Sequence, residues 1–105
     1  MSDQELLELA AKAVGHRVIW YGTNPEVCLM HAPGGASGTR WNPLHDDGDA
    51  LRLAVNLRIT PHIEAHMTDA ESVKGFAAEA HNGDPYAATR RAIVRAAAAI
   101  GEVMP

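Results

Sequence analysis

Residues 84–105 read DPYAATRRAIVRAAAAIGEVMP, and this terminal segment constrains the architecture more than any other. Asp84 belongs to the residue types that cap helix N-termini, and Pro85 has the backbone angle that a first helical turn needs. Apolar residues then recur at helical spacing: Tyr86, Ile93, Ala97, Ile100 and Met104. The pattern predicts a long helix whose apolar stripe packs against the rest of the domain.

The opening of the chain predicts a first helix from Asp3 to Val14. Ser2 and Glu5 fit the S-x-x-E capping box, in which each side chain satisfies a free backbone N–H. Gly15 follows as a residue that readily adopts the left-handed conformation at a helix end. A helix of about three turns is therefore expected before the first strand.

A second helix is expected to start in the acidic segment 45–49 and to end near Leu57. Acidic side chains are favourable there because they meet the exposed amides and the positive end of the helix dipole. The helix is apolar on most sides, so we expect it to be well buried. Only one stripe is polar, formed by Gly48, Arg52 and Asn56.

Four strands are expected between the helices. β-branched and aromatic residues predict strands at Arg17–Tyr21 and Glu26–His31. Clean alternation predicts a third strand at Thr60–Thr68, followed by a turn at Asp69–Ser72 and a weaker strand at Val73–His81. One face of the third strand is expected to be buried, namely Pro61, Ile63, Ala65 and Met67, with Pro61 at the strand start or on a sheet edge.

These elements occur in the order α-β-β-α-β-β-α. Short connections favour antiparallel hairpins, and no linker or repeat divides the chain. We therefore expect a single α+β domain over residues 1–105, with a mainly antiparallel four-stranded sheet and three helices, an α/β/α sandwich.

Composition narrows the functional classes. The chain has 105 residues, 47% of them hydrophobic, which suffices for one core. The formal net charge of −4 argues against nucleic acid as a partner, because such binding needs a basic excess. The single cysteine rules out an intramolecular disulfide. Neither a signal peptide nor a membrane span is apparent, so the cytoplasm is the expected location.

Two clusters raise the possibility of metal chemistry. His62, Glu64 and His66 alternate on one predicted strand face and are ligand types for zinc or iron, although we favour an ordinary solvated sheet face as their explanation. The acidic segment 45–49 could hold a divalent cation, but helix capping accounts for it fully. We expect no metal, no cofactor and no catalytic residue, since no motif spacing supports them.

Five residues are candidates for binding. Trp20 and Trp41 are either core residues or anchors for a partner, because exposed tryptophan concentrates binding energy. Arg40 follows the glycine-rich segment 33–39, which lacks the lysine of a phosphate-binding loop but could still meet an anion. Arg91 and Arg95 lie one turn apart on the last helix, where they could bind an acidic group or pair with nearby acids.

Residues 41–55 (WNPLHDDGDALRLAV) and 84–97 (DPYAATRRAIVRAA), with the LLELAAKA opening at Leu6, resemble the phage ABA sandwich domain family. These are small proteins of tailed bacteriophages and prophages. The resemblance implies an α/β/α sandwich in the cytoplasm of a host bacterium. It implies no reaction and no functional residues.

The leading hypothesis is a non-enzymatic phage or prophage accessory protein that binds a host protein or protein complex, such as an anti-CRISPR-like inhibitor of host defence. One alternative is a small-molecule or nucleotide-binding protein of the sponge type that uses Arg40, the glycine-rich segment and a tryptophan. Another is a metal-binding enzyme built on His62, Glu64 and His66. The sequence leaves the oligomeric state open.

Overall fold

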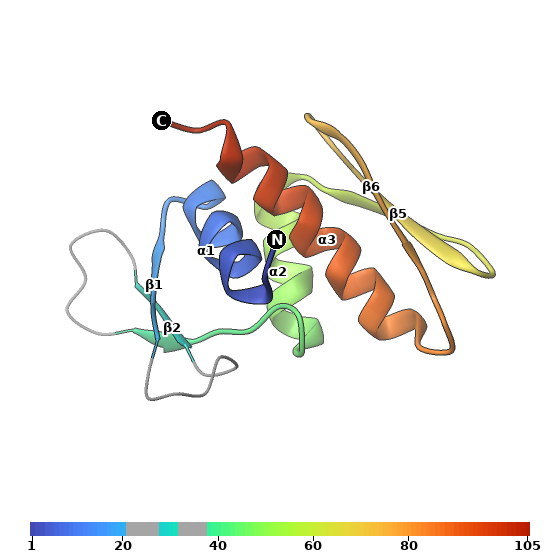
Figure 1. The fold of residues 1–105 in the computed structure, drawn as a ribbon, viewed down its shortest axis with the longest axis horizontal. Coiled ribbons are helices and arrows are strands. Elements are labelled where there is room, and N and C mark those ends of the chain that lie inside the picture. Colours follow the sequence, from blue (N-terminus) through green and yellow to red (C-terminus); the bar gives the residue numbers. More distant parts are fainter. Residues whose placement is uncertain (21–27, 32–37) are drawn as a thin grey trace.

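The computed structural model describes residues 1–20, 28–31 and 38–105, and within them the chain is a single-domain α+β protein (Figure 1). The α+β class and the three helices are confirmed. The elements are α1 (Asp3–Ala13), β1 (Arg17–Trp20), β2 (Cys28–His31), β3 (Thr39–Arg40), α2 (Asp47–Leu57), β4 (Thr60–Ile63), β5 (Met67–Ser72), β6 (Gly75–Ala80) and α3 (Pro85–Glu102).

Each helix begins at a capping residue, which is Ser2 or Asp84 as predicted for the first and last helices and Asp46, within the predicted acidic segment 45–49, for the second. Ser2 Oγ accepts a hydrogen bond from Glu5 N at 3.2 Å, and Asp46 Oδ2 accepts one from Asp49 N at 2.8 Å. Asp84 Oδ1 accepts one from Ala87 N at 3.0 Å. These bonds satisfy amides that have no partner inside the helix, so they fix where each helix starts.

The two terminal helices pack along each other at the centre of the molecule (Figure 1). Small side chains line this contact, which lets the helix axes approach closely. The chain ends are also tied together, because Lys12 Nζ donates a hydrogen bond to the Met104 carbonyl oxygen at 2.9 Å. Both helices carry buried small residues, Ala10 and Ala11 in α1 and Ala97, Ala98 and Gly101 in α3, and Gly101 lies directly against the backbone of Leu9.

The described strands form two three-stranded antiparallel sheets, where the sequence predicts one sheet of four strands. One sheet has the order β1-β2-β3 and the other β4-β5-β6, and Figure 1 shows them on opposite sides of the helices. Part of the predicted strand Glu26–His31 and the end of Arg17–Tyr21 lie outside the described residues.

The predicted continuous strand Thr60–Thr68 is wrong. β4 ends at Ile63, and the chain turns back so that Glu64 N donates to the Met67 carbonyl oxygen at 2.9 Å. The turn lacks glycine and proline and keeps the polar–apolar alternation, so it has none of the usual markers. The predicted turn at 69–72 lies inside β5, and the chain instead turns between Ser72 and Gly75, whose φ is +112°.

The helix α3 covers one face of the β4-β5-β6 sheet. Thr68, Ala70 and Ala77 face α3 and are buried, whereas the outer face is largely exposed. Ile63 and Met67, predicted to be buried, are 62% and 38% exposed. The edge position predicted for Pro61 is confirmed, since β4 is an outer strand. The outer face consists mainly of Thr60, His62, Met67, Glu71, Phe76, Ala78 and Ala80.

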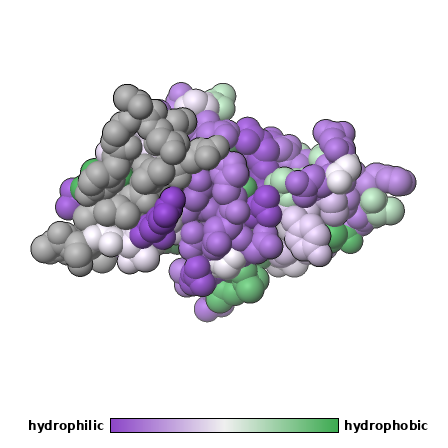
Figure 2. Space-filling view, turned by 90° about the horizontal axis from the view of Figure 1, so that it is seen from below, coloured by the Kyte–Doolittle hydropathy of each residue, from purple (hydrophilic) through white to green (hydrophobic). Residues whose placement is uncertain are grey.

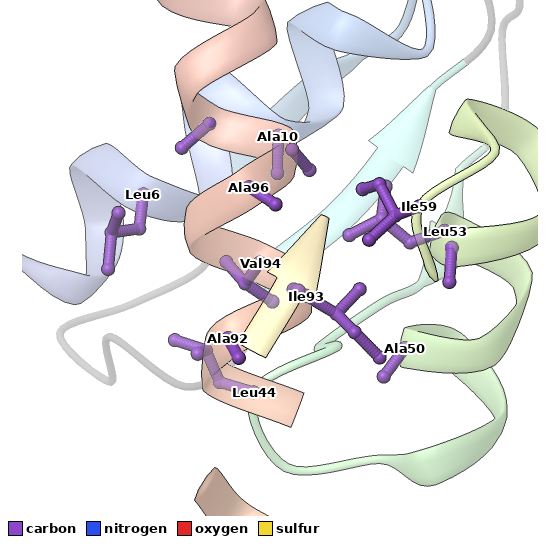
Figure 3. Packing of buried hydrophobic residues seen from close by; sticks show 14 of the residues in the cluster. Leu6, Ala10, Leu44, Ala50, Leu53, Ile59, Ala92, Ile93, Val94 and Ala96 are labelled. Carbon is purple, nitrogen blue, oxygen red and sulfur yellow. The ribbon is translucent and has the colours of Figure 1, made fainter. Parts of the chain in front are cut away.

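The core lies where α1, α2 and α3 meet. In Figure 3, Ile93 points from α3 toward Ala50 and Leu53 of α2. Most other α3 residues in the core are alanines, so the hydrophobic burial per residue is small and close packing supplies much of the stability. The only described polar side chain that is fully buried is Thr68.

The prediction that α2 is well buried is also wrong. Ala50, Leu53 and Ala54 are buried, but Leu51 is 63% exposed and Val55 is 67% exposed. The two exposed residues are one turn apart and therefore share a face. The helix is apolar on a side that the described part of this chain does not cover.

Candidate functional site

A groove of about 540 Å³ lies between α2, β4 and α3. Its volume is within the range of about 300–1,000 Å³ that small-molecule and peptide side-chain sites occupy. Its surface is almost entirely apolar. The lining residues are Asp47, Ala50, Leu51, Pro61, Ile63, Pro85, Tyr86, Thr89, Arg90 and Ile93.

Three large side chains form the walls and are mostly exposed. Leu51 of α2, Ile63 of β4 and Tyr86 of α3 are 63%, 62% and 69% exposed. The floor is closed by Ile93 and Ala50, which are buried and point toward each other across the α2–α3 contact (Figure 3). Three elements thus place apolar surface around one hollow, which distinguishes the groove from scattered exposed hydrophobic residues.

Local sequence fixes the position of each wall. The cap at Asp84 and the proline after it start α3 at Pro85, which places Tyr86 in the first turn. Pro61 has no N–H and suits the outer strand β4, and with Ile63 it lies on the sheet face that lines the groove. The α2 cap at Asp46 places Leu51 and Ala50 in the second turn.

One ion pair closes an end of the groove. Arg90 Nη1 lies 2.7 Å from Asp47 Oδ1, and Arg90 Nε donates to the Leu44 carbonyl oxygen at 2.9 Å. The arginine side chain is only 17% exposed, whereas the aspartate side chain is 66% exposed. The arginine is therefore a structural clamp that ties the segment before α2 to α3.

The surroundings of the groove are acidic. Asp46, Asp47 and Asp84 lie at the N-terminal ends of the two helices and are exposed, and we call these three residues the acidic rim. Arg90 neutralises Asp47 in part, and Arg52 lies 3.9 Å from Asp46. The charge left over is negative, in keeping with the net charge of −4.

The hydroxyl of Thr89, which lines the groove, is already paired. Thr89 Oγ1 lies 2.9 Å from Thr68 Oγ1, which in turn lies 2.9 Å from His81 Nε2. This chain of hydrogen bonds satisfies the one buried hydroxyl of β5 and joins the sheet to α3. The groove is thus suited to apolar recognition, and its walls offer no acid or base other than the Asp47–Arg90 pair.

Figure 2 shows a face on which most of the described surface is hydrophilic, with the hydrophobic surface gathered in a few small areas. Singly exposed apolar residues are ordinary on proteins. The arrangement around the groove differs because its three wall residues come from separate elements and enclose a hollow.

The two predicted tryptophan anchors are largely structural. Trp41 is 5% exposed and belongs to the hydrophobic core, which agrees with the first of its two sequence interpretations. Trp20 is half-buried against the core, and its Nε1 donates to Glu8 Oε1 at 3.0 Å. A tryptophan that follows a loop looks the same in sequence whether it faces inward or outward.

Arg91 and Arg95 pair with acids of the same chain. Arg91 Nη1 lies 3.0 Å from Asp3 Oδ1, and its Nε lies 3.1 Å from Glu79 Oε1. Arg95 Nη1 lies 3.0 Å from Glu79 Oε2 and donates to the Ala78 carbonyl oxygen at 2.8 Å. Both arginines therefore hold α3 to β6. Of the two possibilities that the sequence offers for them, the structure shows pairing with nearby acids.

Arg40 lies in β3 and is exposed. Arg40 borders a second hollow, on the other side of α2. Most of the glycine-rich segment 33–39 lies outside the residues that the structure describes. Of the five predicted binding residues, Arg40 and Trp41 line this hollow together.

The structure does not place His62, Glu64 and His66 on one strand. His62 is in β4 and lies 3.0 Å from Glu71 Oε2, whereas Glu64 and His66 are in the turn that follows. Within residues 1–20, 28–31 and 38–105, no group of at least three histidine, cysteine or acidic side chains could hold a metal ion. The geometric basis for the metal-enzyme alternative is therefore wrong.

The sequence interpretation missed Leu51, Ile63 and Tyr86. One signal was present, because α2 has more apolar residues than a single buried face can use. Which of those residues remain exposed depends on tertiary packing, which the helical pattern alone does not determine.

Comparison with known proteins gives no relative for this chain. No family model matches it, and neither a curated protein nor a solved structure matches it. Among the described helices, none is long and apolar enough to cross a bilayer. The groove and the residues that line it are therefore the main evidence for function in this chain.

Proposed function

We propose that this protein acts by binding another protein, and that an amphipathic helix of that partner docks in the groove between α2, β4 and α3. The observation that carries the proposal is the convergence of Leu51, Ile63 and Tyr86 around an apolar hollow. Helices of partner proteins commonly insert apolar side chains into such grooves.

The energy available is sufficient for specific binding. Complete burial of a large apolar side chain contributes about 1.5–3 kcal/mol. Leu51, Ile63 and Tyr86 are each about two-thirds exposed, so covering each contributes about 1–2 kcal/mol. A cluster of this kind at the centre of an interface has the character of a binding hot spot.

The acidic rim determines the chemistry of the occupant. Asp47 lines the groove, and Asp46 and Asp84 directly precede lining residues at the two helix starts, so the complementary helix has apolar residues on one face and lysine or arginine beside them. An acidic helix of the same shape is repelled. Basic residues also steer the partner toward a protein whose net charge is −4.

We propose a biological setting from the sequence motifs at 41–55 and 84–97. Their resemblance to the phage ABA sandwich family supports the proposal of a non-enzymatic accessory protein that acts in the cytoplasm of a host bacterium on a host protein or complex. An inhibitor of host defence is one such role, because covering a functional surface needs affinity and no chemistry.

Two synthetic helices of equal length test the occupant, one made of leucine and lysine and one of leucine and glutamate. Fluorescence anisotropy with labelled peptide measures each affinity. The double variant Leu51→Gln/Ile63→Gln is expected to weaken binding of the lysine peptide by at least about tenfold. Val73→Gln is the matched control, since Val73 is 85% exposed and lies outside the groove.

The rim is tested separately with Asp46→Asn/Asp84→Asn. Asparagine caps helices as well as aspartate does, so both helix starts are preserved while two charges are lost. The lysine peptide is expected to bind more weakly, and its affinity is expected to depend less on salt. Equal binding of the two peptides by the wild-type protein, or equal loss in the Val73→Gln control, contradicts the proposal.

The natural partner is then sought by comparing captures from bacterial lysate. A host protein that the wild type and Val73→Gln retain, and that Leu51→Gln/Ile63→Gln loses, supports the proposed role. A set of captured proteins that is identical for all three forms contradicts it.

A further inference from the structure

A second hollow of about 290 Å³ lies on the other side of α2, where the connection after α1 meets β3. It shares no lining residue with the groove, because α2 turns different faces to the two sites. Its volume is near the lower end of the range for small-molecule sites, about 300–1,000 Å³. It is also more polar than the groove.

The polar lining of this hollow is rich in hydrogen-bond donors. Arg40 and Arg52 contribute guanidinium groups, His16 an imidazole, Asn56 an amide and Thr39 a hydroxyl. Arginine is suited to phosphate because its planar group can donate two parallel hydrogen bonds.

The one acid that lines the hollow is already neutralised. Asp49 Oδ1 accepts from Arg52 Nη2 at 2.7 Å, and Asp49 Oδ2 accepts from the backbone N–H of Asn42 at 2.9 Å. Its side chain is only 14% exposed. The carboxylate therefore fixes Arg52 and does not repel an incoming anion strongly.

His16 supplies an independent observation. Its Nδ1 atom is buried and has no hydrogen-bond partner within the described part of the chain. The backbone fixes this residue, since His16 N donates to the Ala11 carbonyl oxygen at 2.9 Å beyond the left-handed Gly15. A buried polar atom without a partner is costly, and because the His16 imidazole lines the hollow, a rotation of the ring would bring Nδ1 to a ligand bound there.

We infer that this hollow binds the phosphate group of a small phosphorylated molecule, no larger than a mononucleotide. Arg40 and His16 contact the phosphate, Arg52 adds positive charge, and Thr39 and Asn56 bond the remainder of the ligand. The apolar side of the hollow, which includes Trp41 and Leu53, packs against the non-phosphate part.

Isothermal titration calorimetry with adenosine monophosphate, inorganic phosphate and adenosine tests the inference. Adenosine monophosphate is expected to bind and adenosine is not. Binding of inorganic phosphate as well shows that the phosphate group alone suffices, whereas binding of the monophosphate alone shows that an ester is required. Equal binding of adenosine and its monophosphate overturns the inference, and so does the absence of heat with all three ligands.

Variants locate the site. Arg40→Gln is expected to weaken binding of adenosine monophosphate by about tenfold or more, since a charge-assisted hydrogen bond is lost. Lys74→Gln removes the same charge at a distant turn and is the matched control. His16→Phe removes the unpartnered nitrogen, so it is expected to weaken binding without lowering the melting temperature. Arg40→Gln and Lys74→Gln proteins with equal affinity contradict the assignment.

Discussion

Gly101 of α3 lies so close to Leu9 of α1 that a Cβ atom at position 101 would come within 2.0 Å of the Leu9 carbonyl oxygen. Backbone atoms cannot move aside as a flexible side chain can. The helix contact at the centre of the fold therefore depends on the absence of a side chain at this position.

Replacing this glycine is expected to destabilise the protein. Gly101→Ala forces α1 and α3 apart and lowers the free energy of unfolding by about 1–3 kcal/mol, as overpacking does. Urea denaturation followed by circular dichroism measures the change. Gly48→Ala is the control, because its added methyl meets only flexible side chains and alanine favours helix by up to about 1 kcal/mol. Equal stability of wild type and Gly101→Ala would show that the helices are not in close contact.

Thr68 gives a second stability prediction. Its hydroxyl is fully buried and is the only partner described for the hydroxyl of Thr89 and for His81 Nε2. Thr68→Val keeps the shape of the side chain but leaves both groups without that bond, which costs about 1–3 kcal/mol. Thr60→Val on the exposed face of β4 is expected to change the melting temperature little. A Thr68→Val protein as stable as wild type would show that these hydrogen bonds contribute nothing measurable to the free energy of unfolding.

Arg95 is expected to protect an open sheet edge. β6 is an outer strand, and Arg95 covers its Ala78 carbonyl oxygen at 2.8 Å. Unpaired edge groups are templates for pairing with another chain, and charged side chains suppress such pairing. Arg95→Ala is therefore expected to self-associate more strongly than wild type in sedimentation velocity runs at increasing concentration. Identical sedimentation of Arg95→Ala and wild type would contradict this role.

The helices could be predicted from sequence because their signals are local. Ser2, Asp46 and Asp84 each cap the helix that the sequence places after them. A capping bond involves residues that are only three positions apart, so a short window contains all the information that it needs.

The sheets and the site could not be predicted in the same way. The turn at 64–66 has neither glycine nor proline, and strand pairing depends on residues far apart in sequence. The sequence shows that α2, which includes Leu51 and Val55, has more apolar residues than one buried face can hold. It does not show that the described core leaves them exposed, and it does not show that Trp41 turns inward.

Docking of an amphipathic basic helix in the groove can be observed directly in solution. Nuclear magnetic resonance of the ¹⁵N-labelled protein, titrated with the leucine–lysine peptide, measures which backbone amides change environment. We expect the largest shift changes at Leu51, Ile63 and Tyr86 and at their neighbours in α2, β4 and α3. Shift changes confined to the exposed outer face of β6, around Phe76 and Ala78, or spread evenly over the molecule, would contradict it.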